Sequence, residues 1–187
     1  MQAKVRRIAI VGGTARDCRA VMIDGPSGIL SVFPQSQRPN YEPTNMRIVF
    51  HNGVIAEQFS AEEPERLRGF EFGAAWCDEL ASWQRDEDTW TQLNLTLRES
   101  RVDPQILVTT TPRPTALIRM IRDARRTVNV TGTIFENAEN LSGDYIANAV
   151  EKFGGTRLGR QELYAEILDN MEGALFNRGM FSYGTPT

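Results

Sequence analysis

The sequence has few of the residues that build metal centres and disulfide frameworks. Among its 187 residues are one histidine, His51, and two cysteines, Cys18 and Cys77, which lie far apart and match no metal-binding spacing. A single histidine argues against His-based catalysis or a histidine-rich metal site, and we expect His51 on a surface hairpin. We expect both cysteines to be buried, reduced thiols, as is usual in the cytoplasm.

Long apolar runs and a strong excess of either charge are also missing. No segment reaches the roughly 18–20 apolar residues that cross a bilayer, and the apolar stretch 8–11 is too short for a signal sequence. These absences predict a cytoplasmic protein, in a bacterial or virus-infected bacterial cell. The formal net charge of −3 provides no global basic field, so any DNA contact would depend on local basic clusters or on neighbouring subunits.

What is present is a regular alternation of strand-like and helix-like segments. Asn52-Gly53 between segments 46–50 and 54–59 predicts a hairpin, because both residues tolerate positive φ. The alternation predicts an α/β domain with a mostly parallel central sheet, flanking helices and one antiparallel hairpin. Outside the hairpin, the expected strands are 5–11, 72–77, 106–111 and 128–135, and the main expected helices are 86–99, 115–126, 144–153 and 157–168.

Two adjacent acids follow one of the buried strands. The apolar or small residues 74–77 run directly into Asp78 and Glu79. Ligands of open α/β sheets bind at the carboxyl ends of the strands, and a buried strand gains nothing from ending in carboxylates unless a cation sits there. In nucleotide-hydrolysing motors the first such acid holds the Mg²⁺ shell and the second orients the attacking water. The alternative is a strand that ends in a solvated acidic turn.

Three hydroxyls end the next strand, about thirty residues further on. Thr109, Thr110 and Thr111 could sense the terminal phosphate of a nucleotide, or its attacking water, at the same sheet edge. The alternative is that threonine is simply a favourable strand residue. The spacing from Asp78 and Glu79, with a helix between, favours the functional interpretation.

A charged turn precedes the acidic strand, and one motif is missing. Arg66 and Arg68 stand before Gly69, so either could reach a phosphate as an arginine finger; the alternative is a solvated loop balanced by nearby glutamates. The phosphate-binding signature Gly-x-x-x-x-Gly-Lys-Ser/Thr does not occur in the sequence. The glycine-rich pieces 12–14 and 25–28 lack its lysine and its spacing, so we expect poor nucleotide binding by this chain.

Taken together, these residues resemble the large terminase subunit, the ATPase of tailed-phage DNA packaging, in the branch found in prophages and gene transfer agents. The resemblance runs from about Arg7 to Phe176, and the order and spacing of its motifs are more specific than any one of them. The motifs are RIAIVG at 7–12, VMI-x-G-x-SG at 21–28, EPERLRG at 63–69, AWCDEL at 75–80, TTTPRP at 109–114, GTRLGRQEL at 155–163 and EGALF at 172–176.

The resemblance implies a P-loop NTPase fold of the ASCE type, incomplete at its N-terminus. It places Asp78 in the Mg²⁺ shell, Glu79 as the catalytic carboxylate, and Thr109 to Thr111 as the motif that couples hydrolysis to movement. Arg68, with Arg66 as second choice, would be the finger that acts across a subunit boundary. The implied ligands are Mg²⁺ and ATP. The implied partners are double-stranded DNA, the portal protein, the small terminase subunit and further copies in a ring.

The sequence departs from the family pattern at both ends. The phosphate-binding loop is expected before Arg7 and the nuclease domain after Phe176, so we expect residues 1–176 to be a partial ATPase domain and 177–187 an irregular tail. Hydrolysis by this chain alone should be weak or absent. Two alternatives stay open, namely a fragment of a helicase-type ATPase, and a non-enzymatic remnant that binds a partner.

Overall fold

The computed structural model describes residues 5–168 and divides the chain into two compact units, Met1–Thr110 and Thr111–Thr187. Each unit is described by itself. The expected tail 177–187 and the EGALF motif at 172–176 lie outside the described residues. No helix of the described part is long and apolar enough to cross a membrane.

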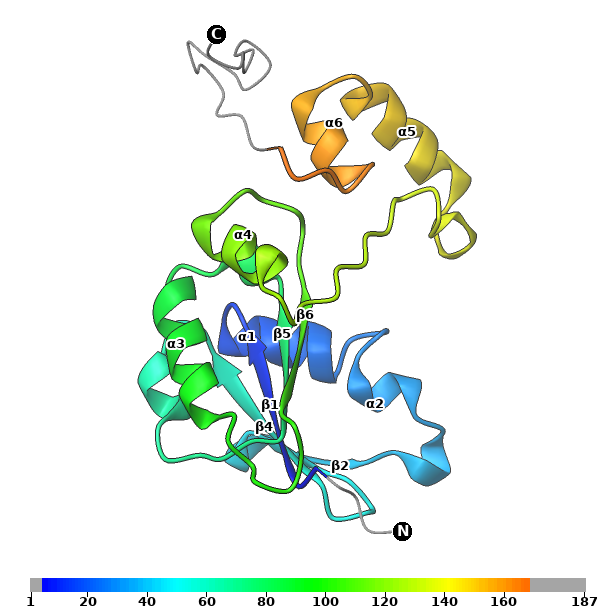
Figure 1. Cartoon of the computed structure of the whole chain (residues 1–187). Coiled ribbons are helices and arrows are strands. Elements are labelled where there is room, and N and C mark those ends of the chain that lie inside the picture. The colour runs from blue at the N-terminus through cyan, green and yellow to red at the C-terminus, as the bar shows by residue number, and fades with distance from the viewer. Residues whose placement is uncertain (1–4, 169–187) are drawn as a thin grey trace, which may run out of the picture. The chain divides into compact units, whose positions relative to one another are not determined.

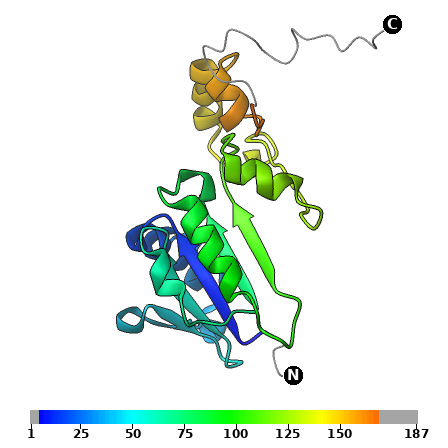
Figure 2. The same ribbon diagram turned by 60° about the vertical axis from the view of Figure 1, so that its left-hand side comes forward.

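The first unit contains a six-stranded sheet in the order β2-β3-β4-β1-β5-β6. Strands β4, β1, β5 and β6 run parallel, whereas β2 and β3 are antiparallel (Figures 1 and 2). This arrangement confirms the predicted α/β class with a mostly parallel sheet. The strands are β1 (Arg7–Gly12), β2 (Asn40–Glu42), β3 (Arg47–Val49), β4 (Ile55–Ser60), β5 (Ala74–Asp78) and β6 (Gln105–Thr109).

The predicted hairpin is confirmed and is larger than expected. Strand β3 pairs antiparallel with β4, and the turn between them contains Gly53 at a φ of +83°, which a residue with a side chain rarely adopts. His51 lies exposed on this turn, as predicted. Strand β2 adds a third antiparallel strand that the sequence did not predict, since its three residues NYE have no apolar periodicity.

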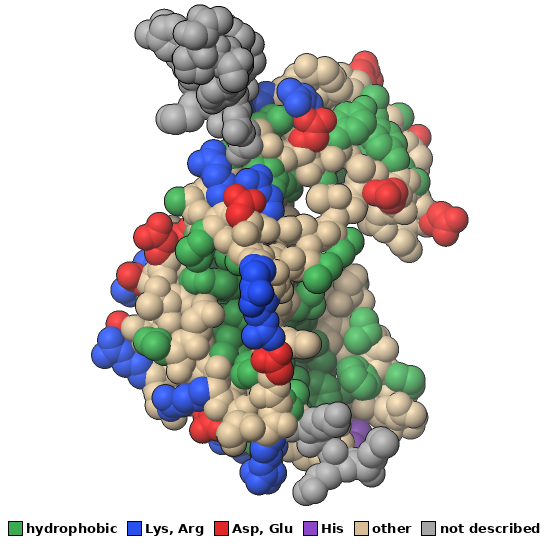
Figure 3. All heavy atoms as spheres, in the orientation of Figure 1, with side chains coloured by type: hydrophobic (Ala, Val, Ile, Leu, Met, Phe, Trp, Pro, Cys, Tyr) green, Lys and Arg blue, Asp and Glu red, His purple; other side chains and the backbone are tan. Residues whose placement is uncertain are grey.

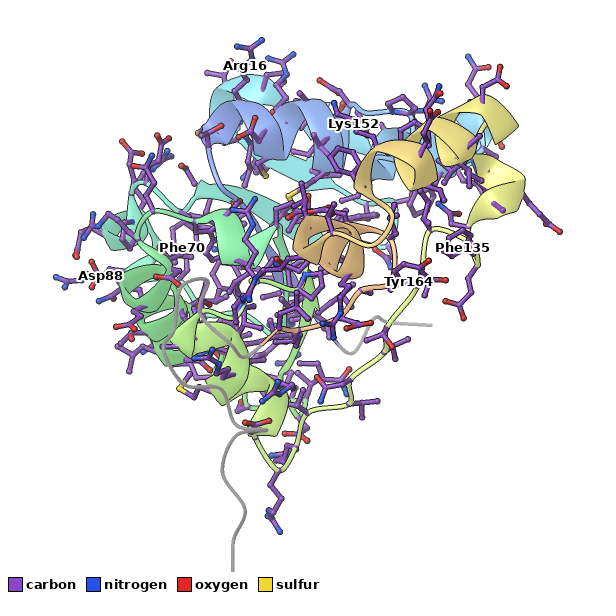
Figure 4. The ribbon with its side chains drawn as sticks, turned by 90° about the horizontal axis from the view of Figure 1, so that it is seen from above. Arg16, Phe70, Asp88, Phe135, Lys152 and Tyr164 are labelled. Atoms are coloured by element: carbon purple, nitrogen blue, oxygen red, sulfur yellow. The ribbon has the colours of Figure 1, made fainter. Side chains whose placement is uncertain are left out.

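Helical segments cover both faces of the sheet. Helix α3 (Asp86–Thr96) lies on one face, whereas α1 (Ala15–Asp17), the π-helical segment Cys18–Ile23 and α2 (Ile29–Val32) lie on the other (Figure 1). Asp88 on the outer side of α3 points away from the sheet (Figure 4). A hydrophobic core lies between the sheet and the π-helical segment Cys18–Ile23. Its buried residues are Ile10, Cys18, Met22, Ile23, Ile48 and Ala56.

Both cysteines are buried free thiols, as predicted. Burial raises the pKa of the Cys18 thiol to about 12 and raises that of the Cys77 thiol as well, because the thiolate loses its hydration. Neither thiol is therefore ionised near neutral pH, and neither is a candidate nucleophile.

The second unit contains the helices α4 (Ala116–Asp123), α5 (Gly143–Phe153) and α6 (Arg157–Glu162). Each begins at a hydroxyl N-cap, where Thr115, Ser142 and Thr156 accept a hydrogen bond from a backbone N–H three residues on. Phe135 and Tyr164 form an aromatic pair in this unit, with ring centroids 5.4 Å apart (Figure 4).

The strand predicted for residues 128–135 is wrong. The segment is irregular, and Val128 and Val130 are 88% and 89% exposed. Its residues have a strand-like alternation, but a strand exists only through hydrogen bonds to a partner. The described residues of this unit contain no sheet that could pair with it.

The helix predicted for residues 157–168 is too long. Helix α6 ends at Glu162, and Ala165 adopts a φ of +53°, so the chain leaves the helical path there.

Candidate functional site at the carboxyl ends of the strands

The parallel strands of the first unit bring their carboxyl ends to one edge of the sheet. Gly12, Ser60, Asp78 and Thr109 are the last residues of β1, β4, β5 and β6. In the β5–β6 register, Asp78 lies directly opposite Thr109. The acid and the hydroxyl that the sequence singled out on separate strands are therefore neighbours.

Asp78 and Thr109 are joined by a short hydrogen bond. The Thr109 hydroxyl donates to Asp78 Oδ1 at 2.5 Å and accepts from the Trp76 indole N–H at 3.2 Å. Thr109 Oγ1 also lies 3.3 Å from the carbonyl of Cys77. A hydroxyl has one proton, and the shorter, charge-assisted bond to the carboxylate takes precedence. The Asp78 carboxylate is thus held in one orientation by neutral groups of its own chain.

Glu79 forms a strained turn after β5. It is exposed and adopts the left-handed conformation, with φ 51° and ψ 41°. A residue with a side chain pays about 1 kcal/mol for this conformation, and such positions cluster at functional sites. The chain leaves the strand path at Glu79, so the two adjacent acids occupy different backbone conformations.

Hydrogen bonds from both sides hold this acidic turn. The Trp83 indole donates to the Asp78 carbonyl at 2.9 Å, and the Ala81 N–H donates to the Thr110 hydroxyl at 3.0 Å. Thr110 follows β6, so a shift of β6 would be felt directly in the turn that carries Glu79. Sequence reasoning missed both tryptophan contacts, although Trp76 stands beside the acids in the quoted AWCDEL motif.

The Asp78 carboxylate fits the way in which proteins hold Mg²⁺. This ion commonly takes one or two carboxylates and completes its octahedron with water and the phosphates of the substrate. The described residues contain no cluster of three or more His, Cys, Asp or Glu that could enclose a metal by itself. One half-buried carboxylate at an open sheet edge therefore suits an ion that arrives with a nucleotide.

The glycine turn after β1 is built for close packing. A Cβ at Gly12 would lie 2.9 Å from backbone atoms of Cys18, so only glycine allows this approach. The Thr14 hydroxyl caps the following helical turn by accepting from the Asp17 N–H at 3.0 Å. The Asp17 carboxylate itself stands at this helix start, where it would repel a phosphate. The turn at 12–14 is thus packed against its own chain and has a carboxylate at the helix start.

Arg66 and Arg68 do not meet Asp78 within the first unit. Arg66 pairs with Glu63 at 3.3 Å and lies 3.2 Å from the Met46 sulfur, and Arg68 pairs with Glu65 at 2.7 Å. All four charged groups are exposed, so these pairs contribute little to stability.

Arg68 lies toward the opposite edge of the sheet. It shares a hollow with Thr96, whose carbonyl accepts from the N–H of Phe72 at 2.9 Å. The next N–H, of Gly73, donates at 3.0 Å to the carbonyl of Arg7, the first residue of β1. This places Arg68 near the amino ends of β1 and β5, whereas Asp78 is at the carboxyl end.

Comparison with known proteins identifies a family and a fold. Residues 1–182 match the family described as terminase large subunit, T4likevirus-type, N-terminal. No curated protein matches the chain. Among solved structures, the large terminase of a thermophilic bacteriophage in complex with ADP aligns with a TM-score of 0.65 and 13% identity, over 87% of this chain and 40% of that one.

Two further structures show the same fold. The thermophilic phage terminase in complex with ATP-gamma-S gives a TM-score of 0.65 at 13% identity, over 87% of this chain and 40% of that one. The ATPase domain of the large terminase from Thermus phage P74-26 gives 0.55 at 15% identity, over 87% of this chain and 77% of that one. The chain thus spans about two-fifths of the length of the first of these relatives.

Proposed function

The chain belongs to the family of T4likevirus-type large terminase subunits, whose N-terminal region it matches, and from this premise we propose that it is the ATPase part of a viral DNA-packaging motor. The motor would use ATP to drive double-stranded DNA into a procapsid. The observation that carries the proposal is the Asp78–Thr109 hydrogen bond beside the strained Glu79 turn. These contacts support a site in which a metal-binding acid, a water-activating acid and a sensing hydroxyl would share one sheet edge.

Each group of this edge has a distinct task. Asp78 would hold Mg²⁺ through its carboxylate while Thr109 fixes the orientation of that group. When bound, the ion would neutralise charge on the nucleotide phosphates. Glu79 would orient the attacking water and accept its proton, for which an exposed carboxylate on a turn is better placed than one in the strand. Chemistry of this kind depends mainly on positioning and charge stabilisation.

The threonines would connect hydrolysis to movement. Loss of the terminal phosphate changes the charge that Asp78 faces, and Thr109 and Thr110 link this acid and its turn to β6. Thr111 is the first residue of the second unit. A displacement of the threonine motif would therefore be passed directly to the chain that enters that unit.

Arg68, with Arg66 as second choice, would act on a nucleotide held by a neighbouring subunit. The position of Arg68 near the amino ends of the strands supports this proposal, since Asp78 lies at the carboxyl end of β5. Copies arranged in a ring would bring the arginine of one to the acids of the next. The further partners proposed are the portal protein and the small terminase subunit, in the cytoplasm of a bacterial host.

Hydrolysis by the isolated 187-residue chain should be weak or absent, because its sequence has no Gly-x-x-x-x-Gly-Lys-Ser/Thr loop. The function is therefore tested in a full-length large subunit built around this sequence. Glu79→Gln should lower ATP hydrolysis at least about a hundredfold while ATP affinity stays within about threefold, because only water activation is lost.

Glu87→Gln is the matched control, since Glu87 is exposed on α3 and lies outside the site. It should hydrolyse ATP at the parental rate. Undiminished hydrolysis in the Glu79 variant would refute the assigned role. A non-enzymatic remnant would give equal background rates in all three proteins, and a helicase-type motor would separate DNA strands where a packaging motor translocates duplex.

A further inference from the structure

A hollow of about 300 Å³ lies on the first unit, near the amino ends of β1 and β5. Two of its lining residues are arginines, Arg68 before β5 and Arg98 after α3. Arg98 belongs to none of the motifs discussed above. The remaining lining residues are Gly69, Phe70, Gln92, Leu95 and Thr96.

Both guanidinium groups keep most of their hydrogen-bonding capacity. Arg98 Nη2 donates to the carbonyl of Phe70 at 3.4 Å, and Arg68 Nε pairs with Glu65 at 2.7 Å on the exposed surface. A guanidinium has five N–H donors in a planar fork that matches phosphate geometry, and these contacts use one of each. The hollow therefore presents two arginines to the same small volume.

The aromatic residue of the hollow cannot serve as a stacking platform for a base. The Phe70 ring is stacked on Phe72 with centroids 5.5 Å apart, and the Arg7 guanidinium lies 5.8 Å from its centroid. Recognition of single-stranded nucleic acid relies on bases that stack on open aromatic faces. The chemistry that remains is the binding of oxyanions by Arg68 and Arg98.

A compact anion fits this hollow better than the backbone of a DNA duplex. Binding along a duplex needs several phosphate contacts on a basic track, whereas Glu65 pairs with Arg68 and the exposed Glu71 follows Phe70 in the chain. Basic and acidic side chains are likewise intermixed on the face seen in Figure 3. Leu95 is 63% exposed at the hollow, and an exposed leucine beside arginines suits a contact with another protein subunit.

We propose that Arg98 is a second phosphate-contacting arginine, which acts beside Arg68 on the triphosphate of a nucleotide held by a neighbouring copy. This inference rests on the proposed function and adds to it a residue and a defined surface. The two arginines approach from different segments, so together they can hold two phosphate groups where one finger would hold a single group.

The test uses the 187-residue chain itself and inorganic tripolyphosphate, titrated by calorimetry without magnesium at low salt. The parent chain should bind the anion in the millimolar range. Arg98→Gln and Arg68→Gln should each weaken binding about fivefold or more, because each removes a charged hydrogen bond. Arg98→Lys should recover part of the loss. The control is Arg101→Gln, which removes a nearby exposed arginine outside the hollow and should change affinity less than about twofold.

A second titration with a 20-base-pair duplex separates the two sources of phosphate. Duplex affinity should fall less than about twofold in Arg98→Gln, since one contact among many is lost. Unchanged tripolyphosphate affinity in Arg98→Gln would overturn the inference, and so would a larger loss for duplex than for tripolyphosphate. Failure of the proposed function would appear instead in the Glu79 hydrolysis test, which does not involve this hollow.

Discussion

The two ends of the parallel strands hold their charges in different ways. At the carboxyl end, Asp78 is fixed by the hydroxyl of Thr109, which in turn is fixed by the indole of Trp76. At the amino end, Arg68 is paired only with an exposed glutamate of its own turn, and Arg98 with a backbone carbonyl. Hydrogen bonds within the chain hold the carboxylate at the carboxyl end, whereas the two arginines at the amino end keep most of their N–H donors available for another molecule.

This difference supports the proposal that the site is divided between copies of the chain. An acid that positions a metal and a water must be preorganised within one subunit, because its geometry decides the rate. An arginine that enters a neighbour's site must instead be able to leave a weak surface pair. The Arg68–Glu65 pair is of this weak kind, since both side chains are more than half exposed.

Replacing the proposed finger gives the strongest test of this comparison. In the full-length subunit, Arg68→Ala should lower ATP hydrolysis about a thousandfold, the range found for arginine fingers, with nucleotide affinity little changed. Arg68→Lys should not restore activity, because a lysine lacks the planar fork. The measurement is steady-state hydrolysis together with nucleotide binding by each variant.

Arg66→Ala is the companion variant for this test. If Arg68 is the finger, hydrolysis by Arg66→Ala should stay within about tenfold of the parent. A loss in Arg66→Ala that exceeds the loss in Arg68→Ala would transfer the role to the second choice. Full ATP hydrolysis by both variants would contradict the proposal that the site is divided between subunits.

The stability of the first unit should also depend on the aromatic residues packed at the amino ends of its strands. Phe72 is fully buried and packs against the rings of Phe59 and Phe70. Phe72→Ala should lower the free energy of unfolding of the first unit by about 3–5 kcal/mol, because a large cavity is left. Urea unfolding measures the loss. Leu95→Ala, at an exposed position of the hollow, should cost less than about 0.5 kcal/mol, and an equal loss in both variants would contradict the described packing.

Much of this architecture could be predicted from the sequence. Strand β5, which ends at Asp78, has apolar residues on both faces, as is typical of strands in parallel sheets. Strand β6 has a similar apolar sequence, but it is the edge strand and its Leu107 is 61% exposed. The Asn52-Gly53 turn identified its hairpin because few other dipeptides tolerate that backbone. Once β5 and β6 are parallel neighbours, the meeting of Asp78 and Thr109 at one edge follows from topology.

The remainder depends on contacts that are distant in sequence. Residues 128–135 have a strand-like pattern but remain irregular, since no partner strand is described for them. Strand β2 shows the reverse case, because its short polar sequence becomes a strand through pairing with β3. Arg98 could not be connected with Arg68 before α3 was placed, since thirty residues of sequence separate them.

Loss of the hydroxyl at the carboxyl end should have a small effect on stability and a specific effect on function. Thr109→Val keeps the shape and the strand propensity of the side chain but removes the bond to Asp78 Oδ1. The free energy of unfolding should fall by about 1 kcal/mol, since the bond lies at an exposed edge where water replaces part of it. Thr109→Ser should restore both stability and hydrolysis, because it returns the hydroxyl. If Thr109→Val hydrolyses ATP and packages DNA like the parent, Asp78 does not need its neighbour, and the internal organisation of the carboxyl end is structural only.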